Sequence, residues 1–297
     1  MFRTFKDVEE YILSNNIVKT IALCGAHDEP ALSAVVDAVR KGVAKAVLIG
    51  DEKGIREILA ELGEAPEKYE IIDMPEEKDS AAQAIRMVRE GKADIPMKGL
   101  MQTSTYMRAI LNKETGILPP GRVLSECTPF EFADGDRFMF VTDCAVNITP
   151  DLGTKVRIIE NAVELAAKFG IEDIKVAALS ALEKVNEKIP SSVEAAQLAE
   201  MEWANCTVEG PFALDNAVSE EAARHKGISS KVAGKADVLL VSDLGMGNVI
   251  HKGLNYFAHI RTAGALCGTE YPVILTSRTD TSDSKYNSIL VAILQSL

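Results

Sequence analysis

Cysteine is scarce in this chain of 297 residues, and its thiols are widely spaced. They are Cys24, Cys127, Cys144, Cys206 and Cys267. The sequence has no CxxC pair and no cluster of cysteine with histidine, which argues against a disulfide framework and against a zinc site. No histidine pairs with cysteine or glutamate at metal-binding spacing, so we expect no metal. The thiols are predicted to be free and buried, as in a reducing cytosol.

Long apolar runs are also missing, and so is any concentration of positive charge. The longest apolar stretches have the length of a strand, and residues 1–16 mix charged with apolar side chains, so we expect neither a membrane span nor a signal peptide. The net charge is −12, without a basic run. This composition argues against nucleic acid as a partner, although a few local arginines suffice to bind a small anion. We therefore expect a cytoplasmic protein with small-molecule partners.

What the chain does contain is a regular alternation of strand and helix patterns. The first series has apolar runs at 19–26, 44–51, 70–74 and 94–99, and helical patterns at 29–42, 54–63 and 80–93. After Arg122, a second series has strands at 138–147, 174–180, 206–212 and 236–243, and helices at 152–170, 191–204, 218–227 and 254–266. Strand 271–277 and helix 284–297 close the chain. The alternation predicts two α/β units with parallel sheets, whose ligands bind beyond the carboxyl ends of the strands.

The most informative strand end is VILTSRTD, where Ser277 and Arg278 follow an apolar strand. An arginine offers a rigid fork of donors that fits a phosphate, and the serine adds a hydroxyl donor. Asp280 and Asp283 follow closely, and either of them could act as a base. The alternative is an ordinary loop in which Asp283 or Ser284 caps the final helix.

A second strand end lies at residues 97–111, MKGLMQTSTYMRAIL. Gly99 permits a close approach of the backbone to a ligand, and Thr103 and Ser104 supply hydroxyls at a helix start, which favours an anion. Arg108 lies four residues after Ser104 and so faces the same side of the helix. The segment is not a Walker loop, because GxxxxGK[ST] is absent. The alternative is a capped helix with one solvated arginine.

A third strand end is VSDLGMGNVIHKG, residues 241–253. Gly245 and Gly247 fit a tight turn, Asp243 stands at the strand end, and Asn248 is placed to open the next helix. The spacing differs from GxGxxG, so a dinucleotide loop is weakly supported and a plain strand–turn–helix connection is the alternative.

Taken together, these segments resemble the phosphate acetyltransferase/phosphate butyryltransferase family, and most closely its butyryltransferase branch. The resemblance runs from about residue 93 to 280 and rests on an ordered set of segments rather than on one motif. In chain order these segments are ADIPMKGLMQTSTYMRAIL, VTDCAVNITPDLGTKVRIIENAVELAAKFGI, VAALSALEKVNEKIPSSVEA, VEGPFALDNAVS, ADVLLVSDLGMGN and PVILTSRTD.

The resemblance implies two α/β/α domains with mostly parallel sheets and an interdomain cleft, on an isocitrate/isopropylmalate dehydrogenase-like plan. It also implies a homodimer. Because Ser277 has to lie near Arg108, we expect the closing strand 271–277 to join the first sheet. The expected domains are residues 1–121 with 268–297, and residues 122–267.

The activity that the resemblance implies is reversible transfer of a short acyl group between coenzyme A (CoA) and phosphate. CoA is then a substrate, and no other cofactor is expected. Phosphate acetyltransferase activity, a non-catalytic acyl-CoA or phosphate-binding regulator, and a dehydrogenase of related fold are the alternatives. The dehydrogenase would need a cluster of metal-binding aspartates, which the sequence does not place.

The family pattern also suggests roles for individual residues. Ser277 and Arg278 match a catalytic Ser-Arg pair, and Asp283 or Asp280 would be the base. Arg108 matches a phosphate-holding arginine, with Thr103 and Ser104 beside it. We expect the acyl-CoA substrate to contact the remaining strand-end residues, which are Lys98, Gly99, Asp243, Gly247 and Asn248.

Overall fold

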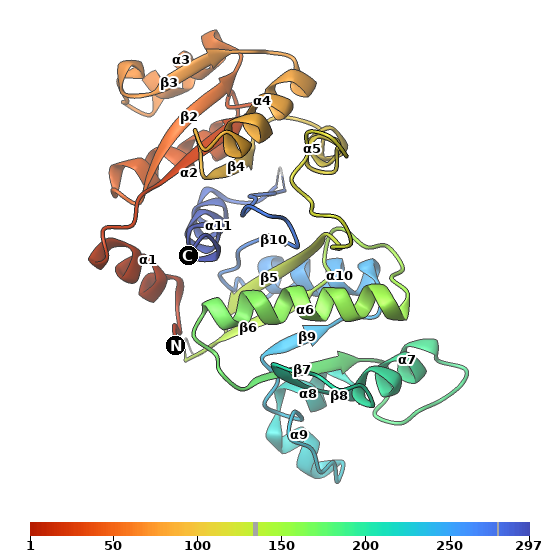
Figure 1. The fold of residues 1–297 in the computed structure, drawn as a ribbon. Helices are drawn as coiled ribbons and strands as arrows, with labels where there is room; N and C mark the ends of the chain where they lie inside the picture. The colour runs from red at the N-terminus through yellow and green to blue at the C-terminus, as the bar shows by residue number, and fades with distance from the viewer. Residues whose placement is uncertain (133–135, 278) are drawn as a thin grey trace. The chain divides into compact units, whose positions relative to one another are not determined.

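The computed structural model describes residues 1–132, 136–277 and 279–297, and it divides into two compact units (Figure 1). We call them the terminal unit, Phe5–Arg122 with Ala263–Leu297, and the middle unit, Val123–Thr262 with Met1–Thr4. Each unit contains a largely parallel sheet with helices, which confirms the predicted fold class. The expected domain boundaries, the interdomain cleft and the dehydrogenase-like plan stay predictions.

The terminal unit is built on a parallel sheet with the strand order β3-β2-β1-β4 (Figure 1). Its strands are β1 (Lys19–Cys24), β2 (Ala44–Gly50), β3 (Glu70–Asp73) and β4 (Ile95–Lys98). In the register, Cys24 of β1 lies opposite Ile49 of β2 on one side and Lys98 of β4 on the other. All four residues of β4 and the last four of β1 are buried, as expected for central strands that are covered on both faces.

The connections of this sheet create a switch point between β1 and β4. Helices α2 (Glu29–Arg40), α3 (Glu52–Glu61) and α4 (Glu77–Arg89) link the four strands. The chain moves outward from β1 through β2 to β3 and then returns to β4. Right-handed crossovers therefore put α2 and α3 on one face and α4 on the other. Beyond the carboxyl ends of β1 and β4 the connections diverge, and such crevices are where open α/β sheets bind ligands.

The predicted strand 271–277 joins the terminal sheet beside β4, but only through isolated bridges. Ile274 pairs in parallel with Met97. The Lys98 N–H donates to the Ile274 carbonyl at 3.0 Å, and the Ile274 N–H donates to the Pro96 carbonyl at 3.0 Å. Pro272 has no N–H to donate, which limits a longer ladder. Val273 pairs instead with Leu266 of β10 (Ala265–Cys267).

Four further helical segments complete the terminal unit. They are α1 (Phe5–Ser14), the 3-10 helix η1 (Pro66–Lys68), α5 (Thr103–Ile110) and α11 (Ser282–Gln295). The closing helix α11 packs against α1 and α2, and it is buried continuously from Lys285 to Leu294. Its ILVAIL run therefore belongs to the core of this unit.

The middle unit has a mixed sheet in which five strands follow the order β5-β6-β9-β7-β8. They are β5 (Ser125–Glu131), β6 (Phe138–Thr142), β7 (Ile174–Leu179), β8 (Cys206–Phe212) and β9 (Val238–Leu240). Only the β5–β6 pair among them is antiparallel. Phe169 packs edge-on against Phe138 at 4.7 Å and Phe140 at 5.1 Å between ring centroids, and this cluster fastens a helix to the sheet.

The helices of the middle unit correct the predictions for residues 244–266, including the prediction that Asn248 opens a helix, since Asn248 lies inside one. They are α6 (Leu152–Lys168), α7 (Pro190–Ala199), α8 (Leu214–Val218), α9 (Glu220–His225) and α10 (Leu244–Tyr256). The expected glycine-rich turn after Asp243 and the expected helix at 254–266 are both wrong. Asp243 caps α10, which begins at the next residue and takes both glycines into the helix. In the part of the chain that the structure describes, every helix is too short or too polar to cross a bilayer.

Candidate active-site residues

Two glycines bring the ends of β1 and β4 into direct contact at the switch point. The Gly99 N–H donates to the Cys24 carbonyl at 2.8 Å, and the Leu100 N–H donates to the Gly25 carbonyl at 2.8 Å. A Cβ on Gly99 would lie 2.3 Å from the Gly25 carbonyl oxygen. Gly25 has φ +64°, and a Cβ there would lie 2.6 Å from the Leu100 carbonyl oxygen. The space beside Gly99 is thus filled by the neighbouring backbone.

The side chains of Lys98 and Cys24 beside this contact are buried, whereas that of Leu100 is exposed. Lys98 is 2 % exposed, and its Nζ donates to the Gly99 carbonyl at 3.2 Å. Burial raises the pKa of the Cys24 thiol to about 12, although the nearby Lys98 charge acts in the opposite direction. Cys24 donates to the Met97 carbonyl at 3.2 Å. Lys98 is therefore placed to hold the turn after β4 together.

Helix α5 starts shortly after this turn and presents its first residues to solvent. Its N-cap is Gln102, whose side chain makes no capping bond, while the Gln102 N–H donates to Glu77 Oε2 at 3.0 Å. Thr103, Ser104 and Arg108 are exposed and lie on this one short helix. An N-terminus without a side-chain cap keeps N–H groups available for an anion. The phosphate contacts expected of Thr103, Ser104 and Arg108 stay a prediction.

Ser277 lies beyond the bridge residues 273 and 274, and its hydroxyl side chain is exposed. Its N–H donates to Asp280 Oδ2 at 2.7 Å, and its carbonyl accepts a 2.7 Å hydrogen bond from Lys285 Nζ. Ser277 Oγ lies 3.1 Å from Thr279 Oγ1. Arg278 lies outside the described residues. Ser277 thus has a fixed backbone and an exposed hydroxyl.

The final helix has a different cap from the one that the sequence suggested. Thr281 is the N-cap of α11, and its Oγ1 accepts a hydrogen bond from the Ser284 N–H at 3.2 Å. Neither Asp283 nor Ser284 fills the capping position, so the predicted cap residues are wrong, although the helix is capped. Asp283 is an exposed residue in the first turn of α11, which leaves its carboxylate open to solvent.

In the middle unit, Asp243 organises the end of β9 and the start of α10. Asp243 Oδ1 accepts from the Met246 N–H at 3.1 Å, and Oδ2 accepts from Ser242 Oγ at 2.7 Å. These bonds, first the one from Ser242, lower the pKa of the Asp243 carboxyl. A Cβ on Gly247 would lie 2.3 Å from the Asp143 carbonyl oxygen, so this glycine lets α10 pack closely. Asn248 is exposed on α10.

Two buried lysines near strand ends were not anticipated from the sequence. Lys285 donates to Thr276 Oγ1 at 3.1 Å as well as to the Ser277 carbonyl. Lys155, 4 % exposed, pairs with Glu194 in the middle unit. Each lysine lies in a segment with an amphipathic helical pattern. The only sign of its burial in the sequence is that a charged residue falls on an otherwise apolar face.

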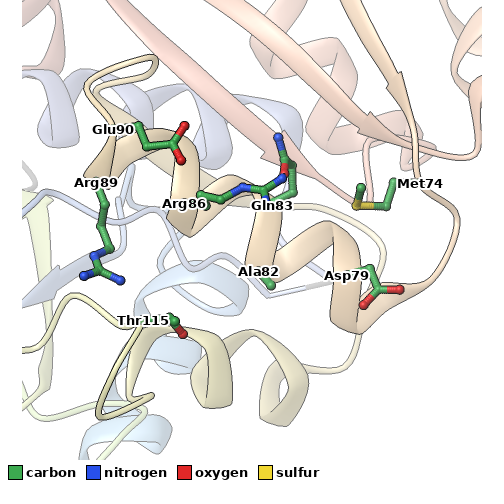
Figure 2. Close-up of a pocket in the computed structure, with 8 residues that line it drawn as sticks. All are labelled: Met74, Asp79, Ala82, Gln83, Arg86, Arg89, Glu90 and Thr115. Carbon is green, nitrogen blue, oxygen red and sulfur yellow. The ribbon is translucent and has the colours of Figure 1, made fainter.

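A separate concavity of about 710 Å³ lies along the exposed side of α4 (Figure 2). Arg86, Gln83 and Asp79 of α4 line it, together with Thr115. The Arg86 guanidinium bonds to Gln83 Oε1, and Arg89 donates to the Glu114 carbonyl at 3.1 Å. None of the expected substrate-binding residues lines this concavity. Within the described ranges no group of three or more metal-binding side chains occurs.

The family model described as "Phosphate acetyl/butaryl transferase" matches residues 76–293. The chain belongs to this family. It is 43% identical to the phosphate butyryltransferase of Clostridium acetobutylicum, over 99% of this chain and 98% of that protein. It is 38% identical to the phosphate acetyltransferase of Thermotoga maritima, over 92% and 94% of the two chains. The predicted family and the predicted acyltransferase class are thereby confirmed.

Solved structures agree with this assignment. A branched-chain phosphotransacylase from Enterococcus faecalis V583 superposes with a TM-score of 0.85 at 32% identity, covering 94% of this chain and 99% of that one. A phosphotransacetylase from Streptococcus pyogenes gives a TM-score of 0.78 at 23% identity, with 98% and 97% covered, and shows the shared fold. The family relationship thus extends to the tertiary structure.

Proposed function

We propose that this chain catalyses the reversible transfer of a butyryl or similar short acyl group between CoA and inorganic phosphate. The observation that carries the proposal is the position of Ser277. Its hydroxyl is exposed beyond the bridge to β4, while both its N–H and its carbonyl are held by side chains. The near full-length similarity to butyryltransferases supports the choice of acyl group.

In the proposed reaction, the CoA sulfur attacks the carbonyl carbon of the acyl phosphate. The thiol proton passes to a carboxylate base, for which Asp283 is our first choice and Asp280 the alternative. The C–S bond forms, the C–O bond to phosphate breaks, and the electron pair leaves with the phosphate. In the other direction a phosphate oxygen attacks the thioester carbonyl, and the thiolate leaves.

Charge stabilisation then falls to the donors on the terminal unit. The Ser277 hydroxyl and Arg278 would stabilise the developing oxyanion and the phosphate, and Arg108 would hold the phosphate beside Thr103 and Ser104. Orientation of two bound substrates supplies much of the remaining rate. No cofactor besides CoA as a substrate enters this scheme.

Contacts to CoA are proposed for the remaining strand-end residues. The side chain of Asn248 is exposed on α10. Gly99 and Gly247 are packed against neighbouring backbone, so they would contribute through their own peptide groups. Lys98 and Asp243 would support these turns, since each is bonded to its local backbone. We further propose a cytoplasmic homodimer.

Acyl preference is the first experiment. Thiol release with phosphate would be compared for acetyl-, propionyl-, butyryl- and isobutyryl-CoA, and we expect the highest kcat/KM with butyryl- or isobutyryl-CoA. A preference for acetyl-CoA would favour the acetyltransferase alternative, which similarity at 38% identity to a phosphate acetyltransferase keeps open. Binding of acyl-CoA without turnover would favour the regulator.

Arg278 gives the second experiment. Arg278→Ala should raise the KM for phosphate and lower kcat by about 10²–10³-fold, as loss of one preorganised donor typically does. Arg278→Lys should recover only part of the rate, because an ammonium group cannot bind phosphate in the bidentate geometry of a guanidinium. Arg56→Ala is a matched control, since Arg56 lies on α3 and pairs with Glu52. Equal kinetics for Arg278→Ala and the control would remove Arg278 from the site.

A further inference from the structure

The peptide groups of Ser277 are held on both sides by oppositely charged side chains. Its N–H donates to the Asp280 carboxylate at 2.7 Å, and its carbonyl accepts from the Lys285 ammonium at 2.7 Å. Hydrogen bonds in which one partner is charged are about twice as strong as neutral ones. The backbone is thus fixed at the residue that carries the proposed catalytic hydroxyl.

Lys285 sits where core stability alone would favour an apolar residue. It is 1 % exposed, and the following residues of α11 are buried as well. No carboxylate among the described residues lies within ion-pair distance of its Nζ. Burial lowers its pKa, with Asp280 and Asp28 acting in the opposite direction. Lys285 also lies near the N-terminus of α11, where the helix dipole disfavours a cation.

Besides the charges of Asp280 and Asp28, these unfavourable features are offset by the pair of hydrogen bonds that Lys285 makes. Nζ donates to Thr276 Oγ1 at 3.1 Å and to the Ser277 carbonyl. Both acceptors belong to the segment that carries Ser277. A buried lysine in this position therefore orders the Ser277 segment, at a cost to the stability of the helix that bears it.

Asp280 is engaged in the same way. Its Oδ2 accepts from the Ser277 N–H, and the Asp280 N–H donates to the Ser277 carbonyl at 3.2 Å. In this turn one carboxylate oxygen of Asp280 acts as a hydrogen-bond acceptor. The side-chain amide oxygen of an asparagine could accept the same hydrogen bond. A general base could not be replaced by an amide in this way, because the amide does not take up a proton.

We propose that Lys285 and Asp280 are positioning residues that hold Ser277 in its reactive orientation, and that Asp280 is not the base. The inference rests on the proposed function of Ser277. A misplacement of a catalytic group by about 1 Å costs about 10²-fold in rate. Loss of either contact should therefore appear in kcat, while the binding of acyl-CoA and phosphate changes little.

The test compares a deleting and a conserving substitution at each position in the full-length chain. Lys285→Met removes both hydrogen bonds and keeps an unbranched apolar side chain one atom shorter, whereas Lys285→Gln keeps an N–H donor. Asp280→Ala removes the acceptor, whereas Asp280→Asn keeps an amide oxygen. We expect Lys285→Met and Asp280→Ala to lower kcat at least tenfold, with each KM within about twofold. The Gln and Asn variants should recover most of that loss.

Stability and pH distinguish this role from a purely structural one. Lys285→Met should melt at or above the wild-type temperature in spite of its lower kcat, whereas a structural lysine would lower both together. Asp280→Asn should keep the wild-type pH profile of kcat. If Asp280→Asn is as slow as Asp280→Ala, or if Lys285→Met keeps the wild-type kcat, the inference is refuted. An inactive wild-type protein would instead refute the proposed function.

Discussion

The contact between Gly99 and Gly25 permits a prediction with a definite sign. Gly99→Ala places a Cβ 2.3 Å from the Gly25 carbonyl oxygen and 3.0 Å from the Cys24 carbonyl oxygen. Both obstacles are backbone atoms at the end of the buried strand β1, so neither can rotate away. Relief requires about 1 Å of movement between two strand ends, since ordinary Cβ contacts lie at 3.4–4 Å.

The magnitude follows from that movement. Overpacking a buried site costs about 1–3 kcal/mol. The shift also stretches two hydrogen bonds of 2.8 Å, from Gly99 to Cys24 and from Leu100 to Gly25, each with a net worth of about 1 kcal/mol. We therefore expect Gly99→Ala to lower the free energy of unfolding by about 3 kcal/mol, a value within the range for severe core substitutions.

Gly253→Ala is the matched control. Gly253 lies within α10, and a Cβ there would meet no atom within 4 Å. The same added methyl group should raise the free energy of unfolding by about 0.5–1 kcal/mol, because alanine has the higher helix propensity. Urea unfolding of both variants provides the measurement. If Gly99→Ala unfolds at the wild-type urea concentration, the argument from backbone contact is wrong.

Three further predictions concern individual ionisable groups. Asp243→Ala should lower the free energy of unfolding by about 1 kcal/mol at pH 7 through loss of the α10 cap. The folded state lowers the pKa of Asp243 below 3.8. The difference in stability between the wild type and Asp243→Ala should therefore be present above pH 3.8 and disappear as the pH falls through the folded-state pKa. Urea unfolding at several pH values would measure it. Cys24, with a pKa of about 12, should stay unmodified by a thiol reagent at pH 8 until denaturant is added, as mass spectrometry would show. Folding lowers the pKa of Lys285 below its unfolded value of 10.5. Between the folded and the unfolded pKa the unfolded state binds more protons, so the free energy of unfolding should rise with pH in that window. Lys285→Met should abolish this rise, which urea unfolding at alkaline pH would measure.

Much of the fold could be read from local patterns. Apolar runs followed by helical periodicity depend only on neighbouring residues, and they placed β1, β2, β4 and α4 close to their observed bounds. Strand β5 was missed for a physical reason. Its residues SECTPFE look polar, yet all but Glu131 are buried, with polar side chains that are hydrogen-bonded within the strand and across to α6. Thr128 donates to Glu126 Oε1 at 2.9 Å, and Asn161 donates to Ser125 Oγ at 2.9 Å.

In the candidate site, too, the sequence predicted which residues matter but not which contacts they make. Strand ends are visible in a sequence, so Ser277, Gly99 and Thr103 could be singled out before any coordinates were known. The uses of these residues depended on contacts that the local patterns do not show, some distant in sequence and some only a few residues away. Gly99 meets Gly25, and the backbone of Ser277 is held by Lys285. A helical pattern assigns a lysine to the solvent face by default, so the burial of Lys285 was not predicted from it.

The local order of residues was enough to predict the α/β class, the family and the set of polar residues at strand ends. Tertiary structure alone decided that β4 lies beside β1, that Ile274 pairs with Met97, and that the cap of α10 falls at Asp243. Strand order and helix ends depend on which buried surfaces and backbone groups find partners across the whole chain. That competition is settled by packing and hydrogen bonding, which residue patterns do not encode.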